Sequence, residues 1–129
     1  MDDKFSSSSL ILLTYKNKAL LMYRQNSAID EEKHAWSFIG GTKATKESFE
    51  DALGKIIEKE MGIRVENVEF VSRSCYHACL TDDNVNHIQR AEGQTLAFFT
   101  LKELQKLLLS SPTREFVSRH GSLITAAYS

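Results

Sequence analysis

The chain lacks several features that would place it in a specialised class of protein. Its 129 residues include one proline and two cysteines, and 16 lysines and arginines stand against 17 aspartates and glutamates, a formal net charge of −1. Nucleic-acid-binding domains normally carry a large basic excess, and acidic disordered tails carry the opposite one. The near-neutral balance argues against both classes. No apolar run in the sequence approaches the roughly 20 residues that a membrane-spanning helix needs.

The N-terminus lacks the basic start and long apolar stretch of a signal peptide, since Met1–Lys4 is mostly charged. With 42% apolar and 26% charged residues, the composition is typical of ordinary soluble globular proteins. The length suits one domain. We therefore expect a cytoplasmic protein with a single domain over residues 10–129, preceded by a polar, partly disordered lead-in over residues 1–9.

The two cysteines lie on a predicted strand with a histidine between them, in the order Cys75, His77, Cys79. Side chains at i and i+2 of a strand stand roughly 6.6–7 Å apart, whereas sulfurs bound to one zinc ion at ~2.3 Å each lie much closer together. A disulfide would also exceed the Cα separation limit of about 7 Å. We expect strand residues with free thiols, as in a reducing compartment. The remaining histidines show no partner in the sequence and are expected to be structural or exposed: His34, His87 and His120.

Apolar, β-prone runs predict three strands in the first third of the chain. Leu10–Tyr15 and Ala19–Arg24 are joined by a short polar turn, which predicts a hairpin. The polar segment Gln25–Lys33 predicts a loop. Ala35–Ile39 predicts a short strand that stops at the glycine pair after it.

The clearest predicted helix follows Ser48, which can cap it with Asp51 three residues on. Apolar residues recur at helical spacing along one stripe: Phe49, Ala52, Leu53, Ile56 and Ile57. Gly62 predicts the end of this helix just after Met61.

The rest of the chain mixes predicted strands and helices. We expect two strands or one bent strand over Val65–Leu80, followed by a polar loop over Thr81–Arg90 and a strand over Thr95–Thr100. We then expect an amphipathic helix over Leu101–Leu109 and a short helix over Thr113–His120 that Pro112 starts. Hairpins mixed with helices predict an α/β (α+β) sandwich around a mixed β-sheet.

The stretch from Trp36 to Ile63 carries the chemical signal. A strand leads to Gly40-Gly41, whose backbone can approach a ligand closely. The helix that follows carries Glu58 and Glu60 near its C-terminal end. Carboxylates on a rigid helix facing a glycine turn can hold Mg²⁺, which prefers oxygen ligands and phosphate partners.

This stretch resembles the box of the Nudix hydrolase family, G-x5-E-x7-R-E-U-x-E-E-x-G-U, where U is a bulky apolar residue. Six of its nine fixed positions match: Gly41, Glu47, Ile57, Glu60, Gly62 and Ile63. Three depart, because Lys55 stands for Arg, Ile56 for Glu and Lys59 for the first of the paired Glu. The segments Leu20–Arg24, Trp36–Gly41 and Leu101–Leu104 also resemble family segments, and Arg90–Gln94 resembles a segment of MutT-type members. The likeness therefore spans roughly Leu10 to Leu109.

The resemblance implies an α/β/α sandwich and an enzyme that uses water and Mg²⁺ or Mn²⁺ to cleave a nucleoside diphosphate linked to another moiety. It implies catalytic and metal-binding roles for Glu60 and Glu92, with the Gly40 carbonyl as a further metal ligand. It also implies that Glu47 and Lys55 pair to brace the loop against the helix, with Gly62 as a structural box residue.

The departures imply a depleted metal site. Ile56 cannot bind a metal ion, and Lys59 places a cation where a ligand is expected; like charges ~4 Å apart repel by about 4 kcal/mol at an effective dielectric of 20. We expect at most one ion, arriving with the substrate's phosphates. A nucleotide or nucleoside diphosphate derivative is the expected partner, with neither a nucleic-acid backbone nor a membrane.

The expected substrate contacts are Arg24, Phe38, Gly41 and Lys59. Several alternatives remain open. Glu60 and Glu92 could be plain surface residues, and the aromatic side chains could form core rather than stack on a base: Tyr23, Trp36, Phe38 and Phe99. The alternatives to hydrolysis are a catalytically inactive nucleotide-binding protein of the same fold and a purely structural or interaction protein. A homodimer is compatible with any of the three.

Overall fold

The computed structural model describes residues 8–24, 34–89 and 95–126. Most of the predicted lead-in (1–7), the predicted loop 25–33 and the segment 90–94, which contains Glu92, lie outside the described residues. No helix in the described part of the chain is long and apolar enough to cross a membrane.

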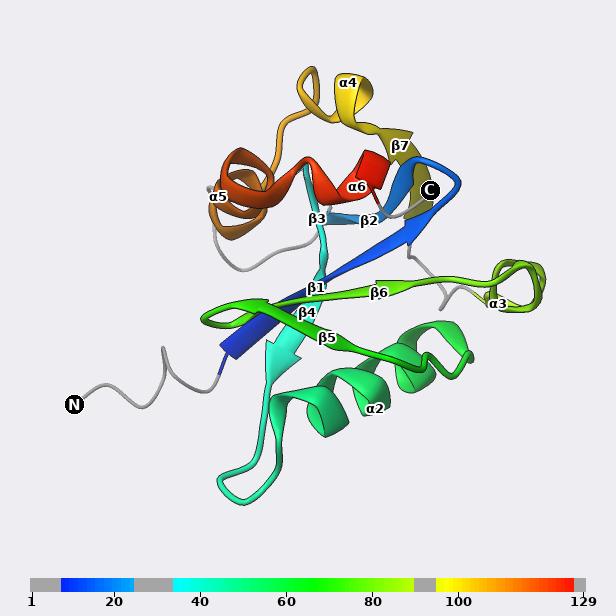
Figure 1. The fold of residues 1–129 in the computed structure, drawn as a ribbon, viewed down its shortest axis with the longest axis vertical. Coiled ribbons are helices and arrows are strands. Elements are labelled where there is room, and N and C mark those ends of the chain that lie inside the picture. Colours follow the sequence, from blue (N-terminus) through cyan, green and yellow to red (C-terminus); the bar gives the residue numbers. More distant parts are fainter. Residues whose placement is uncertain (1–7, 25–33, 90–94, 127–129) are drawn as a thin grey trace.

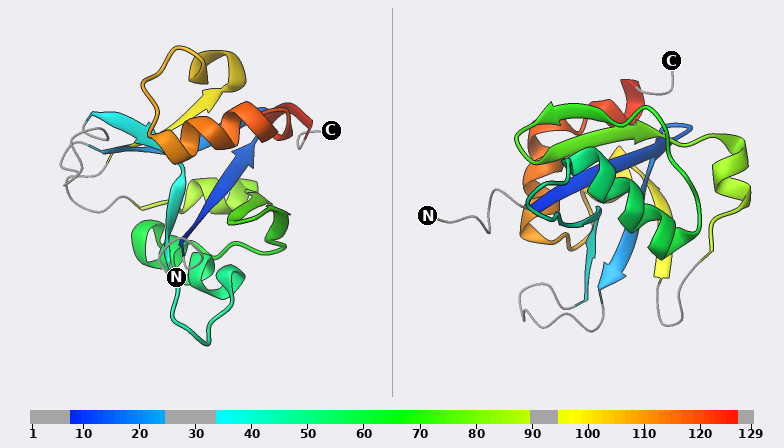
Figure 2. Two further views of the ribbon diagram at one scale, coloured as in Figure 1. Left: turned by 90° about the vertical axis from the view of Figure 1, so that its left-hand side faces the viewer. Right: turned by 90° about the horizontal axis from the view of Figure 1, so that it is seen from below.

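A mixed β-sheet lies between two layers of helices, which confirms the predicted α/β/α sandwich (Figures 1 and 2). Helix α2 covers one face, and α5 and α6 cover the other. The elements are β1 (Ser8–Tyr15), β2 (Lys18–Arg24), β3 (Ala35–Ser37), β4 (Ile39–Thr42), α2 (Phe49–Met61), β5 (Glu69–Ser72), β6 (Cys75–Cys79), α3 (Asp82–Asn86), β7 (Thr95–Thr100), α4 (Leu101–Leu104), α5 (Ser111–His120) and α6 (Leu123–Ala126).

Strand β1 lies at the centre of the sheet. The strand order is β3-β2-β1-β6-β5, with β4 also paired to β1 and β7 to β2. β1 pairs in parallel with β6, and the other pairs are antiparallel. β2 pairs with the end of β1, at Thr14 and Tyr15. The N-terminal half of the same edge of β1 pairs with β4.

The predicted first hairpin is confirmed. Lys16 and Asn17 form its turn with φ of 49° and 66°. Positive φ at both central residues is what a two-residue turn needs to match the twist of the flanking strands. The same strands feed two cores, because successive side chains point to opposite faces. Ile11 and Leu13 pack with α2, whereas Leu12 packs with α5.

Two predictions near the glycine pair are wrong. The predicted strand Ala35–Ile39 is two strands that separate at Phe38, and β4 runs through Gly40 and Gly41 instead of stopping there. The glycines continue the strand because they pair with Leu10 and Ser9 of β1. For the same reason the ordered strand begins before the predicted boundary, and Ser9 is buried rather than part of a lead-in.

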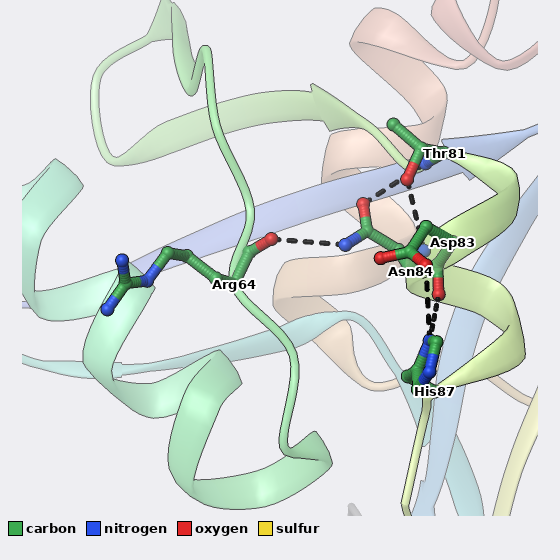
Figure 3. A network of polar contacts seen from close by, with 5 residues as sticks. All are labelled: Arg64, Thr81, Asp83, Asn84 and His87. Atoms are coloured by element: carbon green, nitrogen blue, oxygen red, sulfur yellow. Dashed lines mark hydrogen bonds and ion pairs between the residues drawn. The ribbon is translucent and has the colours of Figure 1, made fainter.

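The predicted region Val65–Leu80 resolves into two antiparallel strands, β5 and β6. The predicted loop Thr81–Arg90 is wrong in part, because it contains helix α3. Thr81 and Asn84 cap that helix reciprocally, and the Asn84 amide also donates to the Arg64 carbonyl at 3.1 Å (Figure 3). This contact ties α3 to the chain that leaves α2.

The predicted helix Leu101–Leu109 is wrong beyond Leu104. The chain there runs beside β3, where Trp36 N donates to Leu108 O at 2.9 Å and Ser110 N donates to Trp36 O at 3.0 Å. This pairing satisfies backbone groups that would otherwise belong to a longer helix. The predicted last helix is confirmed as α5 with Pro112 in its first turn, and α6 after it was not predicted.

Candidate functional site

Helix α2 forms where the sequence predicts it. Ser48 Oγ accepts from Asp51 N at 3.0 Å, and Gly62 closes the helix with φ of 70°. The buried side chains lie along one stripe: Ala52, Leu53, Ile57 and Met61. This packing fixes the rotation of the helix, so Ile56 and Glu60 are half-buried beside that stripe while Lys59 is exposed.

The loop before α2 is tied to the helix by an ion pair. Lys55 Nζ lies 2.7 Å from Glu47 Oε2, as the family resemblance implied. Glu47 Oε1 also accepts from Ala44 N at 3.1 Å. The Lys55 ammonium, followed by the Ala44 amide, holds the pKa of Glu47 below its ordinary value, and Glu47 raises the pKa of Lys55. The loop from β4 is thereby held against the helix.

The two glycines of β4 face opposite sides of the sheet. A Cβ at Gly41 would lie 2.7 Å from Ile56 Cδ1, on the side of α2. A Cβ at Gly40 would lie 2.4 Å from Ser9 O and 2.7 Å from Leu10 Cδ2, on the side of α5. Ile56 therefore covers Gly41 with an apolar side chain at the box position where the family has a carboxylate.

The described residues do not fit a resident metal ion. Glu60 is half-buried on α2, whereas Glu58 and Lys59 are exposed. Across residues 8–24, 34–89 and 95–126, no group of three or more histidine, cysteine, aspartate or glutamate side chains could hold an ion. Glu92, the expected third carboxylate, lies outside the described residues.

The expectation that Phe38 contacts substrate is wrong. Its side chain is 0% exposed and packs edge-on against Phe116, with ring centroids 5.2 Å apart. A ring enclosed in this way belongs to the core. The backbone of Arg24 lies at the end of β2 opposite Ala35, and its side chain is outside the described atoms.

The other aromatic candidates contact one another. Trp36 lies 5.2 Å from Tyr23 and 4.8 Å from Phe99, measured between ring centroids. These rings come from β3, β2 and β7, which adjoin in the sheet. Such pairs stabilise a sheet face. Trp36 and Phe99 are partly buried against the core on the α5 side, and Tyr23 is half-buried near the end of β2.

His77 has a partner that the sequence did not reveal. Its Nε2 lies 2.9 Å from Thr14 Oγ1, and its Nδ1 lies 3.6 Å from Glu69 Oε1. Burial lowers the pKa of His77 despite the opposing influence of Glu69. Cys75 is half-buried, Cys79 is exposed, and the two form no disulfide. The contacts of His77 are those of a buried structural histidine.

A cavity of about 630 Å³ adjoins the glycine pair on the α5 side of the sheet. We call it the β4–α5 pocket. Its walls come from the starts of β1 and β6, from β4, from the turn between β5 and β6, and from α5. Ligand pockets commonly have volumes of roughly 300–1,000 Å³. The pocket includes Gly40 and Gly41, so it connects with the box.

Three basic residues of this pocket were missed by sequence reasoning: Arg73, Arg119 and His120. Arg73 lies on the β5–β6 turn, and the other two lie in the last turn of α5. No local pattern places them beside Gly40, because their proximity depends on how α5 packs on the sheet. The sequence alone shows only that the predicted last helix ends in basic residues, Arg119 and His120.

Comparisons with known proteins agree with this architecture. A family model described as "NUDIX domain" matches residues 4–120. No curated protein matches the chain. Among solved structures, a mutT/nudix family protein from Listeria innocua has TM-score 0.72 and 19% identity, with 94% of each chain covered.

Two structures of NrtR from Shewanella oneidensis are also similar. The NUDIX domain in complex with ADP ribose has TM-score 0.64 and 14% identity, with 89% of this chain and 85% of that chain covered. NrtR in complex with a 27mer DNA has TM-score 0.69 and 18% identity, with 93% of this chain and 62% of that chain covered. At these identities the likeness shows a common fold.

Proposed function

This chain belongs to the NUDIX domain family, and from that membership we propose that it hydrolyses a nucleoside diphosphate linked to another moiety. The observation that carries the proposal is the box element: the Gly40-Gly41 backbone lines the β4–α5 pocket, and the Glu47–Lys55 ion pair holds the loop after it against α2, the helix that carries Glu60. A ligand whose diphosphate crosses β4 would place one end in the pocket and its phosphates beside α2. ADP ribose in the NrtR complex is a compound of this chemical class.

Glu60 is the box carboxylate that we assign to the reaction, together with Glu92. Water adds to one phosphorus, the bond from that phosphorus to the bridging oxygen breaks, and the two phosphate products leave. A carboxylate in this position can orient the water and take its proton. When the Ile56 side chain adopts another rotamer, Gly41 lets the diphosphate approach the backbone, and Arg24 is the cation that we assign to the phosphates.

The ion enters this proposal as part of the substrate, since the described residues do not fit a resident ion. A nucleotide arriving as its Mg²⁺ or Mn²⁺ complex brings its own partly neutralised phosphates. Glu60, the Gly40 carbonyl and Glu92 are the groups that we propose would contact that ion. Bound divalent ions stabilise charge that develops on phosphoryl oxygens.

A second candidate function is nucleotide binding without hydrolysis. The identity of residue 56 favours it, because an isoleucine packed against Gly41 stands where the family box has a carboxylate. Lys59 would then contact a phosphate directly in place of an ion. Binding of ADP ribose that persists in EDTA, with no turnover, would favour this candidate over the hydrolase.

Phosphate-product analysis separates the two candidates. The wild-type chain is incubated with Mg²⁺ or Mn²⁺ and a panel of ADP ribose, nucleoside triphosphates and dinucleoside polyphosphates, with Glu60→Gln as control. A hydrolase turns over at least one compound faster than Glu60→Gln. Equal product formation by the two proteins across the panel would contradict hydrolysis at this site.

The near-neutral charge supports a small-molecule substrate over a nucleic-acid backbone. We therefore propose an enzyme that acts on free nucleotides, and we separately propose that it is cytoplasmic. A homodimer is compatible with the fold, because β5 is an edge strand that exposes Phe70. Light scattering of the purified chain measures its oligomeric state.

A further inference from the structure

The β4–α5 pocket has an unusual balance of side chains for a site that would hold a nucleobase. Base recognition generally combines an open aromatic face with hydrogen-bonding groups aimed at the base edge. Among the described residues that line this pocket, Phe116 is the one phenyl, phenol or indole ring. It is 2% exposed, with its ring edge-on to Phe38 and to His120 at 5.2 and 5.7 Å between centroids. No open face of that ring remains for stacking.

The charged groups of the pocket are mostly cationic. Arg73 is exposed on the β5–β6 turn, opposite the end of α5 that carries Arg119 and His120. Among the described lining residues Glu115 is the one carboxylate, and it pairs with Arg119 Nη2 at 3.0 Å. A guanidinium has five N–H donors, so this pair leaves Arg119 with donors for a ligand.

The pocket also contains small hydroxyl groups, which can donate hydrogen bonds to a ligand. Ser72 Oγ lies 3.1 Å from His120 Nε2, which joins the end of β5 to α5 across the pocket. Ser74, in the turn that follows β5, has φ of 64° and is the neighbour of Arg73 in the chain. Hydroxyl and guanidinium donors on two facing walls suit an oxyanion, since charge-assisted hydrogen bonds to carboxylate or phosphate are stronger than neutral ones.

We propose that the β4–α5 pocket binds a ligand end group that is itself an oxyanion, held by Arg73 and Arg119 with Ser72 and His120 beside them. This inference deepens the proposed function and rests on it for the nature of the whole substrate, which becomes a nucleoside diphosphate linked to an acidic moiety. Phosphate and carboxylate share the required chemistry. The test therefore includes both.

Titration calorimetry with three compounds of one carbon skeleton tests the charge requirement: ribose 5-phosphate, ribonate and ribose. We expect ribose 5-phosphate or ribonate to bind and ribose to bind at least about tenfold more weakly, and the tighter of the two acids identifies the oxyanion. Raising the salt concentration weakens an interaction of this kind. Ribose binding as tightly as both acids, or no binding of either acid, would overturn the proposal.

Substitution of the two arginines tests the location. The double variant Arg73→Gln, Arg119→Gln is expected to weaken binding of the acid by about tenfold or more. The matched control is Arg114→Gln on the same helix, since Arg114 is exposed and lines a different groove, against α4. Unchanged affinity in the double variant, or an equal loss in the control, would contradict the assignment.

The two cysteines provide an internal readout of the occupied site. Cys75 lines the pocket, whereas Cys79 lies outside it and is exposed. An acid present at about ten times its dissociation constant should slow alkylation of Cys75 by iodoacetamide about tenfold and leave Cys79 unchanged. If Cys75 reacts too slowly, amide resonances of the β5–β6 turn report the same contact. Changes confined to Cys79 would place the ligand elsewhere and overturn the inference.

The binding, substitution and alkylation experiments need no metal ion and no substrate turnover, so they are independent of the hydrolysis assay. Failure of the hydrolysis assay would contradict the proposed function and leave the oxyanion pocket intact. Failure of the acids to bind would remove the pocket assignment and leave hydrolysis to be judged by its own assay.

Discussion

At the residue scale, Gly40 and Gly41 allow β4 to lie close to its neighbours. A side chain at either position would meet different atoms. A Cβ added at Gly40 would meet the backbone carbonyl of Ser9, which cannot move without opening the β1–β4 pairing. A Cβ added at Gly41 would meet the terminal methyl of Ile56, and that side chain can adopt another rotamer. Equal substitutions at the two positions should therefore have unequal effects.

Gly40→Ala is predicted to lower the free energy of unfolding by about 1–3 kcal/mol, as overpacking does. Gly41→Ala should cost less, about 0.5–1.5 kcal/mol for an off-rotamer side chain. Adding Ile56→Val removes the Cδ1 methyl and should recover part of the Gly41→Ala cost. Urea unfolding of the variants measures each value, and strictly additive effects in Gly41→Ala, Ile56→Val would contradict the contact.

The Glu47–Lys55 pair predicts a pH dependence. Because Lys55 and the Ala44 amide lower the pKa of Glu47, the pair stabilises the fold above the unfolded-state pKa of about 4.3. That stability is lost as pH falls through the lower folded-state pKa. The stability difference between wild type and Glu47→Gln should thus be constant near neutral pH and shrink toward about pH 3. Denaturant titrations at several pH values measure it, and a difference that grows on acidification would contradict the ion pair.

His77 predicts a second pH effect, in a higher range. Burial lowers the pKa of His77 in the folded state, so the neutral imidazole contributes stability above about pH 6.5, and that stability is lost as pH falls below this value. Melting temperatures of the wild type should fall between about pH 7.5 and pH 5 more steeply than those of His77→Gln. His87→Gln, an exposed histidine, is the matched control. Parallel curves for wild type and His77→Gln would contradict burial as the cause.

At the element scale, the helices differ in how far their sequence determines them. Helix α2 was predicted in full because its caps at Ser48 and Gly62 and its apolar stripe are local. Helix α4 was predicted too long because the backbone pairing of Leu108 and Ser110 with Trp36 depends on a distant strand. The β4–α5 pocket could not be predicted for the same reason, since Arg73 and Arg119 come to line one pocket only through the packing of α5.

Helix α3 was predicted as a loop. The sequence contains the two residues of its reciprocal cap, Thr81 and Asn84, but this short helix has no buried residue and therefore no apolar pattern that would predict it. Thr81→Ala is predicted to cost about 1 kcal/mol through loss of the cap. Asn84→Ala should cost more, because it also loses the bond to Arg64 O. Asn86→Ala, exposed in the same helix, is the control, and thermal unfolding ranks the three; equal losses would contradict the cross-link.

At the scale of the whole molecule, β4 separates two chemically different faces. On the α2 face the box keeps its loop brace and Glu60, but the half-buried Ile56 packs against Gly41. On the α5 face the pocket presents arginines and hydroxyls. A substrate spanning both faces would bring its own ion to the first and an acidic end to the second, so binding and chemistry would reside on opposite sides of one strand.

Restoring the two family glutamates at positions 56 and 59 tests whether Ile56 and Lys59 limit turnover. The double variant Ile56→Glu, Lys59→Glu returns two carboxylates to the helix, and we expect it to raise Mg²⁺-dependent turnover at least about tenfold over wild type. Because the carboxylate introduced at position 56 would face Gly41, a loss of stability is expected and is measured separately by thermal unfolding. A folded double variant with no gain in turnover would contradict the depleted metal site as the limit.

The most direct test of the account is the rate of product release from nucleoside diphosphate derivatives in Mg²⁺, measured for wild type and Glu60→Gln side by side. Glu60 is assigned to the water or the ion, so its replacement should lower kcat by about a hundredfold or more while the fold and the binding of acids in the β4–α5 pocket remain. Wild-type turnover matched by Glu60→Gln would contradict hydrolysis by the box helix.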